Sequence, residues 1–126
     1  MAASGADVHL LHVTTTPSVS YMACNGAYDC GVMISASHNP FYDNGIKLIN
    51  GDGEKMDEGV ISLVEDYLDG KLMLDGEILE QLPMASGDDI GCIIDDVAGR
   101  DHYAQHLIPL VQPPCQGTRV PRAGAN

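Results

Sequence analysis

The feature that most constrains the fold is a strand–helix–strand pattern in the first 35 residues. Residues 8–13 (VHLLHV) form a short β-prone apolar run that ends at a Thr-Thr-Thr-Pro segment. Apolar residues at helical spacing follow to about residue 27, with Thr16 as the predicted N-cap and Pro17 in the first helical position. Residues 31–35 (GVMIS) are small, apolar and β-branched, which predicts a buried strand. Such a βαβ unit implies a parallel sheet.

The rest of the sequence continues this alternation. Residues 37–45 (SHNPFYDNG) are dense in turn formers and predict a loop, followed by a strand over residues 46–49 and a second turn over residues 50–53. A helix is expected from Asp57, with Gly70 as its C-cap and with one apolar face. That face consists of Val60, Ile61, Val64 and Leu68.

Residues 71–94 fit neither a helix nor a strand clearly, and an amphipathic helix is predicted from Asp95 to about Leu110. The expected fold class is therefore α/β: a partial three-layer domain over residues 1–112, with a mixed, mostly parallel sheet flanked by helices. Residues 113–126 are rich in proline, lack apolar periodicity and are predicted to form an irregular, disordered tail.

Charge and hydropathy exclude several classes of partner. Lys and Arg total 6 against 18 Asp and Glu, giving a net charge of −12. This field disfavours nucleic acids and anionic membranes, and an anionic ligand would need local cations or a metal. No apolar run is long enough to span a membrane, and the N-terminal residues lack a signal-peptide pattern, so a cytoplasmic protein is expected. The four cysteines contain no CxxC pair, which favours reduced thiols over zinc ligands: Cys24, Cys30, Cys92 and Cys115.

The loop after the second predicted strand carries the candidate chemistry. Parallel sheets place ligand crevices at the carboxyl ends of their strands. Ser37 supplies an oxygen nucleophile, His38 can exchange protons near neutral pH, and Lys47 returns a cation toward the same rim. Gly45 is expected to allow a positive φ at the turn. From the residues alone, a structural turn remains an alternative, and neither a serine-hydrolase triad nor a GxSxG elbow is present.

The loop sequence resembles a known family. Ser-Ala-Ser-His-Asn-Pro at residues 35–40, with Asp-Asn-Gly-Ile-Lys at residues 43–47, resembles the active-site serine loop of the α-D-phosphohexomutases. Residues 11–17 resemble the strand and Thr-Pro entry upstream of that loop. Gly-Asp-Gly-Glu-Lys-Met at residues 51–56 resembles the bacterial branch that acts on glucosamine phosphates. The resemblance is expected to cover about residues 5–110.

The resemblance implies roles for individual residues. Ser37 would be phosphorylated and would exchange its phosphoryl group with a sugar phosphate through a bisphosphate intermediate, with Ser35 as the nearest competitor. One phosphoserine oxygen at Ser37 would bind Mg²⁺, and Lys47 would assist proton transfer or the developing charge. His38 would shape the catalytic site, and Asn39 would contact substrate. The implied reaction interconverts glucosamine 6-phosphate and glucosamine 1-phosphate and supplies UDP-N-acetylglucosamine synthesis.

The resemblance also implies what the chain does not contain. It would begin partway through the first of four domains, without the loops that supply the metal carboxylates, read the sugar and bind its phosphate. The isolated chain is therefore expected to have little or no activity without the missing domains as partners. Two alternatives remain open: the same chemistry on mannose or glucose phosphates, and a non-catalytic α/β module.

Two further patterns have structural explanations. His102 and His106 are four residues apart on the last predicted helix, but no third metal ligand is evident, so a solvated helix face is expected. The Asp88-Asp89 and Asp95-Asp96 pairs favour helix capping and helix-dipole effects over metal binding.

Overall fold

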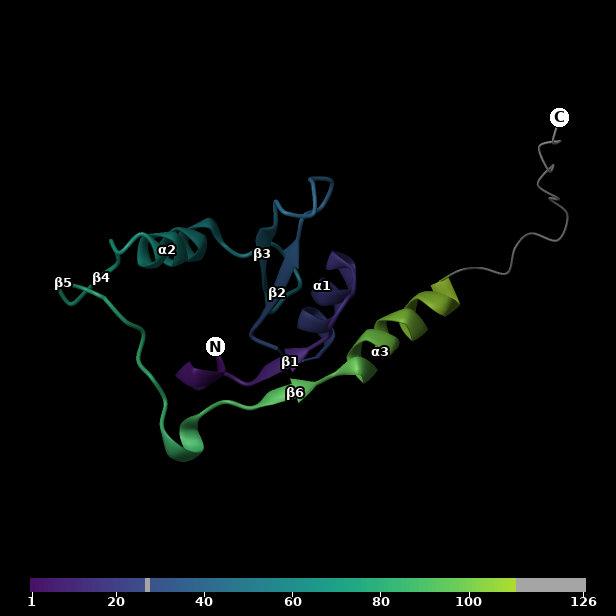
Figure 1. Ribbon diagram of the computed structural model, residues 1–126. Helices are drawn as coiled ribbons and strands as arrows, with labels where there is room; N and C mark the ends of the chain where they lie inside the picture. Colours follow the sequence, from purple (N-terminus) through teal and green to yellow (C-terminus); the bar gives the residue numbers. More distant parts are fainter. Residues whose placement is uncertain (27, 111–126) are drawn as a thin grey trace, which may run out of the picture.

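The computed structural model describes residues 1–26 and 28–110. Short elements alternate along the chain, and Figure 1 shows that they form an open arrangement with several projecting segments. In order, the elements are η1 (Ala2–Ser4), β1 (Val8–Leu10), α1 (Thr16–Asn25), β2 (Cys30–Ser35), β3 (Gly45–Asn50), α2 (Glu58–Leu68), β4 (Met73–Leu74), β5 (Glu77–Ile78), η2 (Gly87–Asp89), β6 (Ile93–Asp95), α3 (Val97–Leu107) and η3 (Ile108–Leu110).

The strands pair in both directions, which confirms the α/β class with mixed pairing. β1 pairs parallel with β6, from Val8 opposite Ile93 to Leu10 opposite Asp95. β2 and β3 form an antiparallel hairpin over all six residues of each strand, and β4 pairs antiparallel with β5. Antiparallel pairs therefore predominate among the described residues, where a mostly parallel sheet was expected.

The predicted βαβ unit is wrong in one respect, because β1 and β2 are not paired with each other in the described part of the chain. The strand after α1 instead finds its partner in the next strand along the sequence, across the loop of residues 36–44. A hairpin requires only a short loop, whereas the partner of β1 lies about 85 residues away.

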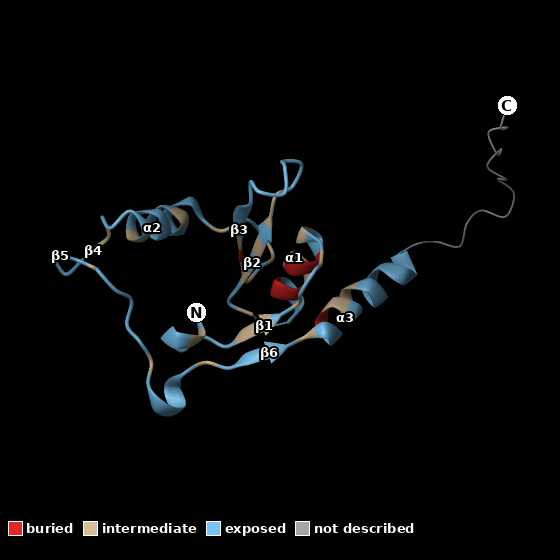
Figure 2. Cartoon of the chain, in the orientation of Figure 1, coloured by how far each residue is buried: buried red, intermediate tan, exposed pale blue. Residues whose placement is uncertain are grey.

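The core lies where α1 packs against the β2–β3 hairpin, and we call these three elements the packed unit. Val19 and Ala23 of α1 meet Ile49 of β3, with Leu11 and Met33 packed around them. Gly31 makes the close approach possible, because a Cβ at that position would lie 2.7 Å from the Val19 side chain. Figure 2 shows that the buried residues concentrate in this region.

The strand β2 is half-covered, where a buried strand was expected. Its residues alternate between exposed and half-buried, because α1 covers one face of the hairpin. On the other face Ile34 is 67% exposed. The sequence of β2 is apolar on both faces, as in a strand covered on both sides, but the described residues cover only one.

The helix α2 begins at the predicted cap, and it ends one residue earlier than predicted, with Asp69 as its C-cap. Asp57 caps it by accepting a hydrogen bond from the Gly59 N–H at 2.7 Å, and Gly70 follows its last turn with φ 68°. Its apolar face is largely uncovered, and Leu68 is 75% exposed. Together with the β4–β5 hairpin, α2 forms what we call the α2 arm, which projects from the packed unit in Figure 1.

The helix α3 lies where the last helix was predicted, but it begins at Val97 and ends at Leu107 instead of running from Asp95 to about Leu110. Asp96 is its N-cap and accepts a hydrogen bond from the Gly99 N–H at 2.8 Å. Among the described residues, no helix is long and apolar enough to cross a bilayer. The predicted tail (residues 113–126), the proposed domain boundary at residue 112 and Cys115 lie outside the described residues. Cys24, Cys30 and Cys92 are free thiols.

Candidate active site

The serine loop, residues 36–44, connects the last ladder pair of the β2–β3 hairpin. That pair is Ser35 opposite Gly45, so both ends of the loop are fixed by strand hydrogen bonding. Two turns follow one another within the loop: the Asn39 N–H donates to the Ala36 C=O at 2.9 Å, and the Asp43 N–H donates to the Pro40 C=O at 2.9 Å. The loop is therefore a folded structure on the end of a rigid hairpin.

Ser37 adopts a left-handed backbone conformation, with φ 55°. Its N–H donates to the Ser35 Oγ at 3.0 Å, and its own side chain is exposed. A left-handed conformation costs a residue with a Cβ about 1–2 kcal/mol. One hydrogen bond contributes about 0.5–1.5 kcal/mol, so the bond to Ser35 offsets much of that cost. The positive φ expected at Gly45 is wrong: Gly45 lies in β3, and the left-handed residue is Ser37.

This backbone turn separates the two serines. In an extended strand, the side chains of residues 35 and 37 would face the same way. In the structure the strand ends at Ser35, whose side chain is half-buried and accepts the hydrogen bond from Ser37. The Ser37 hydroxyl is the more accessible of the two.

His38 lies beside the Ser37 hydroxyl. The Ser37 Oγ and the His38 Nδ1 are 3.3 Å apart, so the hydroxyl can donate to the ring when Nδ1 carries no proton. No carboxylate among residues 1–26 and 28–110 hydrogen-bonds to His38. The geometry allows proton exchange between His38 and the Ser37 oxygen.

Asn39 stabilises the loop. Its Nδ2 donates to the Asp43 Oδ2 at 3.0 Å, and Asn44 closes the next turn by donating from Nδ2 to the Phe41 C=O at 3.2 Å. The Asn39 side-chain oxygen has no hydrogen-bond donor among the described residues, so it could still accept one from a ligand.

Lys47 is not brought into contact with Ser37. It lies in β3 opposite Met33 and shares a strand face with Ile49, the face that α1 covers. Its side chain is exposed and makes no hydrogen bond or ion pair within residues 1–26 and 28–110. No hydrogen bond or ion pair among the described residues joins Lys47 to Ser37, so its place beside the catalytic serine stays a prediction.

A groove of about 560 Å³ runs along β3 between the packed unit and α2. Aliphatic side chains such as Leu48, Ile61 and Val64 line much of it, with Lys47 and Lys55 also present. Ser37 is not part of its lining, and an apolar groove suits a sugar phosphate poorly. The serine loop therefore lies outside this groove.

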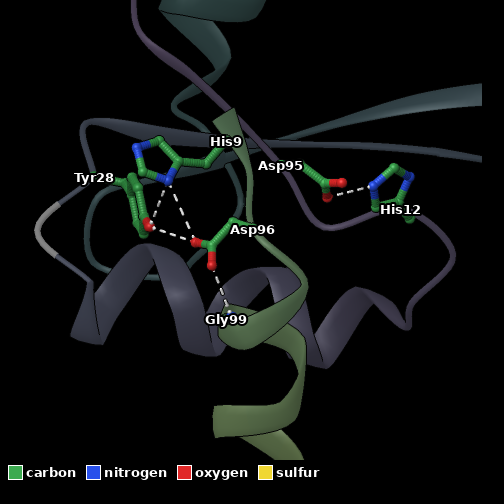
Figure 3. Close-up of polar contacts among 6 residues, drawn as sticks. All are labelled: His9, His12, Tyr28, Asp95, Asp96 and Gly99. Carbon is green, nitrogen blue, oxygen red and sulfur yellow. Dashed lines mark hydrogen bonds and ion pairs between the residues drawn. The ribbon is translucent and has the colours of Figure 1, made fainter. Parts of the chain in front are cut away.

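A second polar cluster joins the two ends of the described chain, and the sequence did not predict it. Figure 3 shows Tyr28 and His9 meeting the carboxylate of Asp96. The Tyr28 hydroxyl donates to the Asp96 Oδ2 at 3.1 Å, and the His9 Nδ1 lies 3.3 Å from the same oxygen. Asp95, the residue before Asp96, makes a similar contact: its Oδ1 lies 2.7 Å from the His12 Nε2. Only the cap signal at Asp96 was visible in the sequence.

The electrostatics of this cluster favour a charged Asp96. The hydrogen bond from the Gly99 N–H, followed by those from His9 and Tyr28, lowers the pKa of the Asp96 carboxyl against the opposing effect of burial. Burial raises the pKa of Tyr28, and the adjacent Asp96 carboxylate raises it further. These shifts describe a capped helix start tied to β1, with a structural role.

No group of three or more His, Cys, Asp or Glu residues within residues 1–26 and 28–110 is arranged to hold a metal ion. His102 and His106 are exposed, as expected, but they also pack against Tyr21 of α1, with ring centroids 5.7 and 4.5 Å away. Near Ser37 the nearest carboxylate in the loop, Asp43, is already bonded to Asn39. The described residues therefore do not form a magnesium site by themselves.

Comparison with known proteins agrees with the loop sequence. Residues 1–73 match the family described as phosphoglucomutase/phosphomannomutase, alpha/beta/alpha domain I. The chain is 56% identical over all 126 residues to a phosphoglucosamine mutase of Lachnospira eligens, of which it covers 26%. It is 51% identical over 95% of its length to one of Lachnoclostridium phytofermentans, of which it covers 25%. A phosphoglucosamine mutase of Brevibacillus brevis is 38% identical over 97% of the chain, which covers 26% of that relative.

The similarity extends further than the sequence motifs indicated. The alignment with the Lachnospira eligens protein includes residues 111–126, so the expected end of the resemblance near residue 110 is too early. The chain spans about a quarter of the length of the curated relatives it matches. From its matched domain and its serine loop, the chain belongs to the phosphoglucomutase/phosphomannomutase family.

Proposed function

We propose that this chain supplies the phosphoryl-carrying serine of a phosphoglucosamine mutase, which interconverts glucosamine 6-phosphate and glucosamine 1-phosphate. The observation that carries the proposal is Ser37 itself: an exposed hydroxyl, set by a left-handed backbone, on a loop fixed at both ends by β2 and β3. The printed names of the relatives support the choice of glucosamine phosphates.

The proposed reaction has two phosphoryl transfers. In the first, the bond between phosphorus and the Ser37 oxygen breaks, and a sugar hydroxyl oxygen forms a bond to the same phosphorus while losing its proton. The bisphosphate then reorients. In the second, the Ser37 oxygen takes the other phosphoryl group, and the sugar oxygen that leaves regains a proton. Phosphoryl transfer of this kind depends chiefly on positioning and on neutralising charge.

The residues around Ser37 suit part of this chemistry. His38, 3.3 Å from the Ser37 oxygen, is placed to take or return a proton at that atom. Asn39 has a side-chain oxygen left to accept a hydrogen bond from the sugar. For Lys47 we propose a role in proton transfer or charge neutralisation that requires its side chain to reach toward the loop, since it makes no contact there now.

Mg²⁺ would act by polarising the phosphoryl oxygens and neutralising their charge. One oxygen of phosphorylated Ser37 is the ligand that this chain would contribute. The described residues offer no further ligand set around that oxygen. A net charge of −12 also disfavours retention of a sugar phosphate by the chain alone, so we propose little or no turnover without further domains.

The proposal is tested by intact mass measurement after incubation of the full 126-residue chain with glucosamine 1,6-bisphosphate and Mg²⁺. The expected result is one added phosphate on the wild type and none on Ser37→Ala. Parallel incubations with mannose and glucose 1,6-bisphosphates test the alternative sugars, and faster labelling by either would shift the assignment to that branch. A folded wild-type chain that takes up no phosphate from any of the three would favour a non-catalytic module.

A further inference from the structure

Ser35 is the last residue of β2, and its hydroxyl stands at the base of the serine loop. Its side chain is half-buried, while Ser37 and His38 are exposed. Its main chain is fixed by the ladder pair with Gly45. The Ser35 Oγ accepts the hydrogen bond from the Ser37 N–H at 3.0 Å. Because the Ser35 main chain is held in the strand and its side chain is half-buried, its hydroxyl has little freedom to move. It can therefore hold in place the N–H group that donates to it.

The backbone conformation of Ser37 needs support of the kind that the Ser35 hydroxyl gives. Its φ of 55° lies in the region that residues with a Cβ disfavour, and a rotation about its N–Cα bond to a right-handed conformation would turn its side chain relative to the peptide plane that carries its N–H. The hydroxyl would then leave the position 3.3 Å from the His38 Nδ1. Within the described residues, the Ser35 Oγ is the acceptor of the Ser37 N–H, so this bond fixes the peptide plane between residues 36 and 37. Because β2 and β3 hold both ends of the loop, a change of φ at Ser37 would have to be compensated by turning that plane, which would break the bond.

We propose that Ser35 is a positioning residue for the phosphoryl-carrying serine. Its hydroxyl holds the main chain of Ser37 in the left-handed conformation and so presents the Ser37 oxygen for phosphoryl transfer. Ser35 forms no bond to phosphorus in this role and keeps its own proton. The inference rests on the proposed function and adds to it a role for a residue that the sequence suggested only as a competing phosphoryl acceptor.

The first test measures the contact itself. Amide hydrogen exchange at Ser37 is followed by NMR in the ¹⁵N-labelled full chain, for the wild type, Ser35→Ala, Ser35→Thr and the control Ser62→Ala on the exposed side of α2. Loss of the hydroxyl in Ser35→Ala should speed exchange at Ser37 about two- to tenfold. Ser35→Thr keeps a hydroxyl and should match the wild type, as should the control. Equal exchange in Ser35→Ala and the wild type would overturn the proposal.

The second test measures the consequence. The same four proteins are incubated with glucosamine 1,6-bisphosphate and Mg²⁺, and the rate of phosphate incorporation at Ser37 is followed by mass spectrometry. Ser35→Ala should be slower by about tenfold or more, because small displacements of a reacting atom are costly, and Ser35→Thr should recover the rate. Circular dichroism should be the same for all four.

The outcomes of these tests distinguish a failure of the positioning role of Ser35 from a failure of the proposed function. A wild type that is labelled at the same rate as Ser35→Ala overturns the positioning role and leaves the proposed function intact. A wild type that takes up no phosphate overturns the proposed function, and with it the role of Ser35 in transfer. Slow labelling of both Ser35→Ala and Ser35→Thr also overturns the proposal, because the hydroxyl would then not be the group that matters.

Discussion

The packed unit and the α2 arm are built from similarly apolar sequences but differ in what they bury. In the packed unit, Val19, Ala23 and Ile49 are nearly inaccessible to solvent, and the serine loop stands directly on the strands that hold them. In the α2 arm, a well-capped helix leaves Leu68 75% exposed. The contrast indicates that capping residues set where α2 begins and ends, whereas the position of the candidate catalytic serine depends on the packing beneath its loop.

The largest expected effect comes from truncating the core of the packed unit. Ile49→Ala should lower the free energy of unfolding by about 3 kcal/mol, because it removes buried methyl groups and leaves a cavity. Leu68→Ala, the matched change in the α2 arm, should lower it by about 0.5 kcal/mol or less. Urea denaturation of both variants measures the two values, and equal losses would contradict the distinction between the regions.

The next effect concerns two glycines with positive φ, one packed against α1 of the packed unit and one at the end of α2. Gly53 has φ 80°, and a Cβ there would lie 2.6 Å from the Ser20 C=O oxygen of α1. Gly70 has φ 68° with open space around it. Both alanine variants carry the backbone cost of about 1 kcal/mol, and Gly53→Ala adds a clash that brings it to about 2 kcal/mol. If Gly70→Ala proved the more damaging on urea denaturation, the packing around Gly53 would be wrongly described.

A smaller effect should follow loss of the cap of α3. Asp96→Ala removes the acceptor of the Gly99 N–H and of the Tyr28 hydroxyl, and should cost about 1 kcal/mol near pH 7. Asp101→Ala, at an exposed position of the same helix, serves as the control.

The stability that the Asp96 carboxylate contributes should be lost in acid. The pKa of Asp96 is lowered in the folded chain from its ordinary value of 3.8, so its contribution is complete above that value and is lost as the pH falls through the folded pKa. The gap between the wild type and Asp96→Ala, measured by urea denaturation, should therefore shrink below about pH 3.8. A gap that widens in acid would contradict the account.

The smallest effect concerns an exposed ion pair. Lys55 and Glu58 form a salt bridge near the start of α2, and both side chains are largely accessible to solvent. Lys55→Ala should change the free energy of unfolding by less than about 0.5 kcal/mol, because solvent screens such pairs. Urea denaturation at low and high salt checks this, and a loss as large as that of Gly53→Ala would show that the α2 arm is coupled to the packed unit more strongly than described.

The parts of the fold that sequence predicts well are those set by neighbouring residues. The hairpin strands, the serine loop, and the caps of α2 and α3 all follow from turn formers and apolar spacing within a few residues. The pairing of β1 with β6 joins residues 85 apart, and the contact of His9 with Asp96 joins residues 87 apart, so no local pattern encodes either of them.

The candidate site also has features that the sequence predicts and features that it does not. Ser37, His38 and Asn39 are adjacent in the chain, and the structure keeps them together on one loop. The left-handed conformation of Ser37 was not predicted, because serine rarely adopts it and the support comes from a side chain two residues earlier. Lys47 was expected near the site from its place in the sequence, and it lies in β3 opposite Met33, but no hydrogen bond or ion pair among the described residues joins it to Ser37.

The most direct test of the account is the position of the phosphate after reaction of the chain with glucosamine 1,6-bisphosphate and Mg²⁺. Peptide fragmentation distinguishes Ser35 from Ser37 within the same peptide. The account predicts phosphate on Ser37, the exposed serine with the left-handed backbone, and none on the half-buried Ser35. Phosphate on Ser35 would contradict both the choice of acceptor and the positioning role assigned to its hydroxyl.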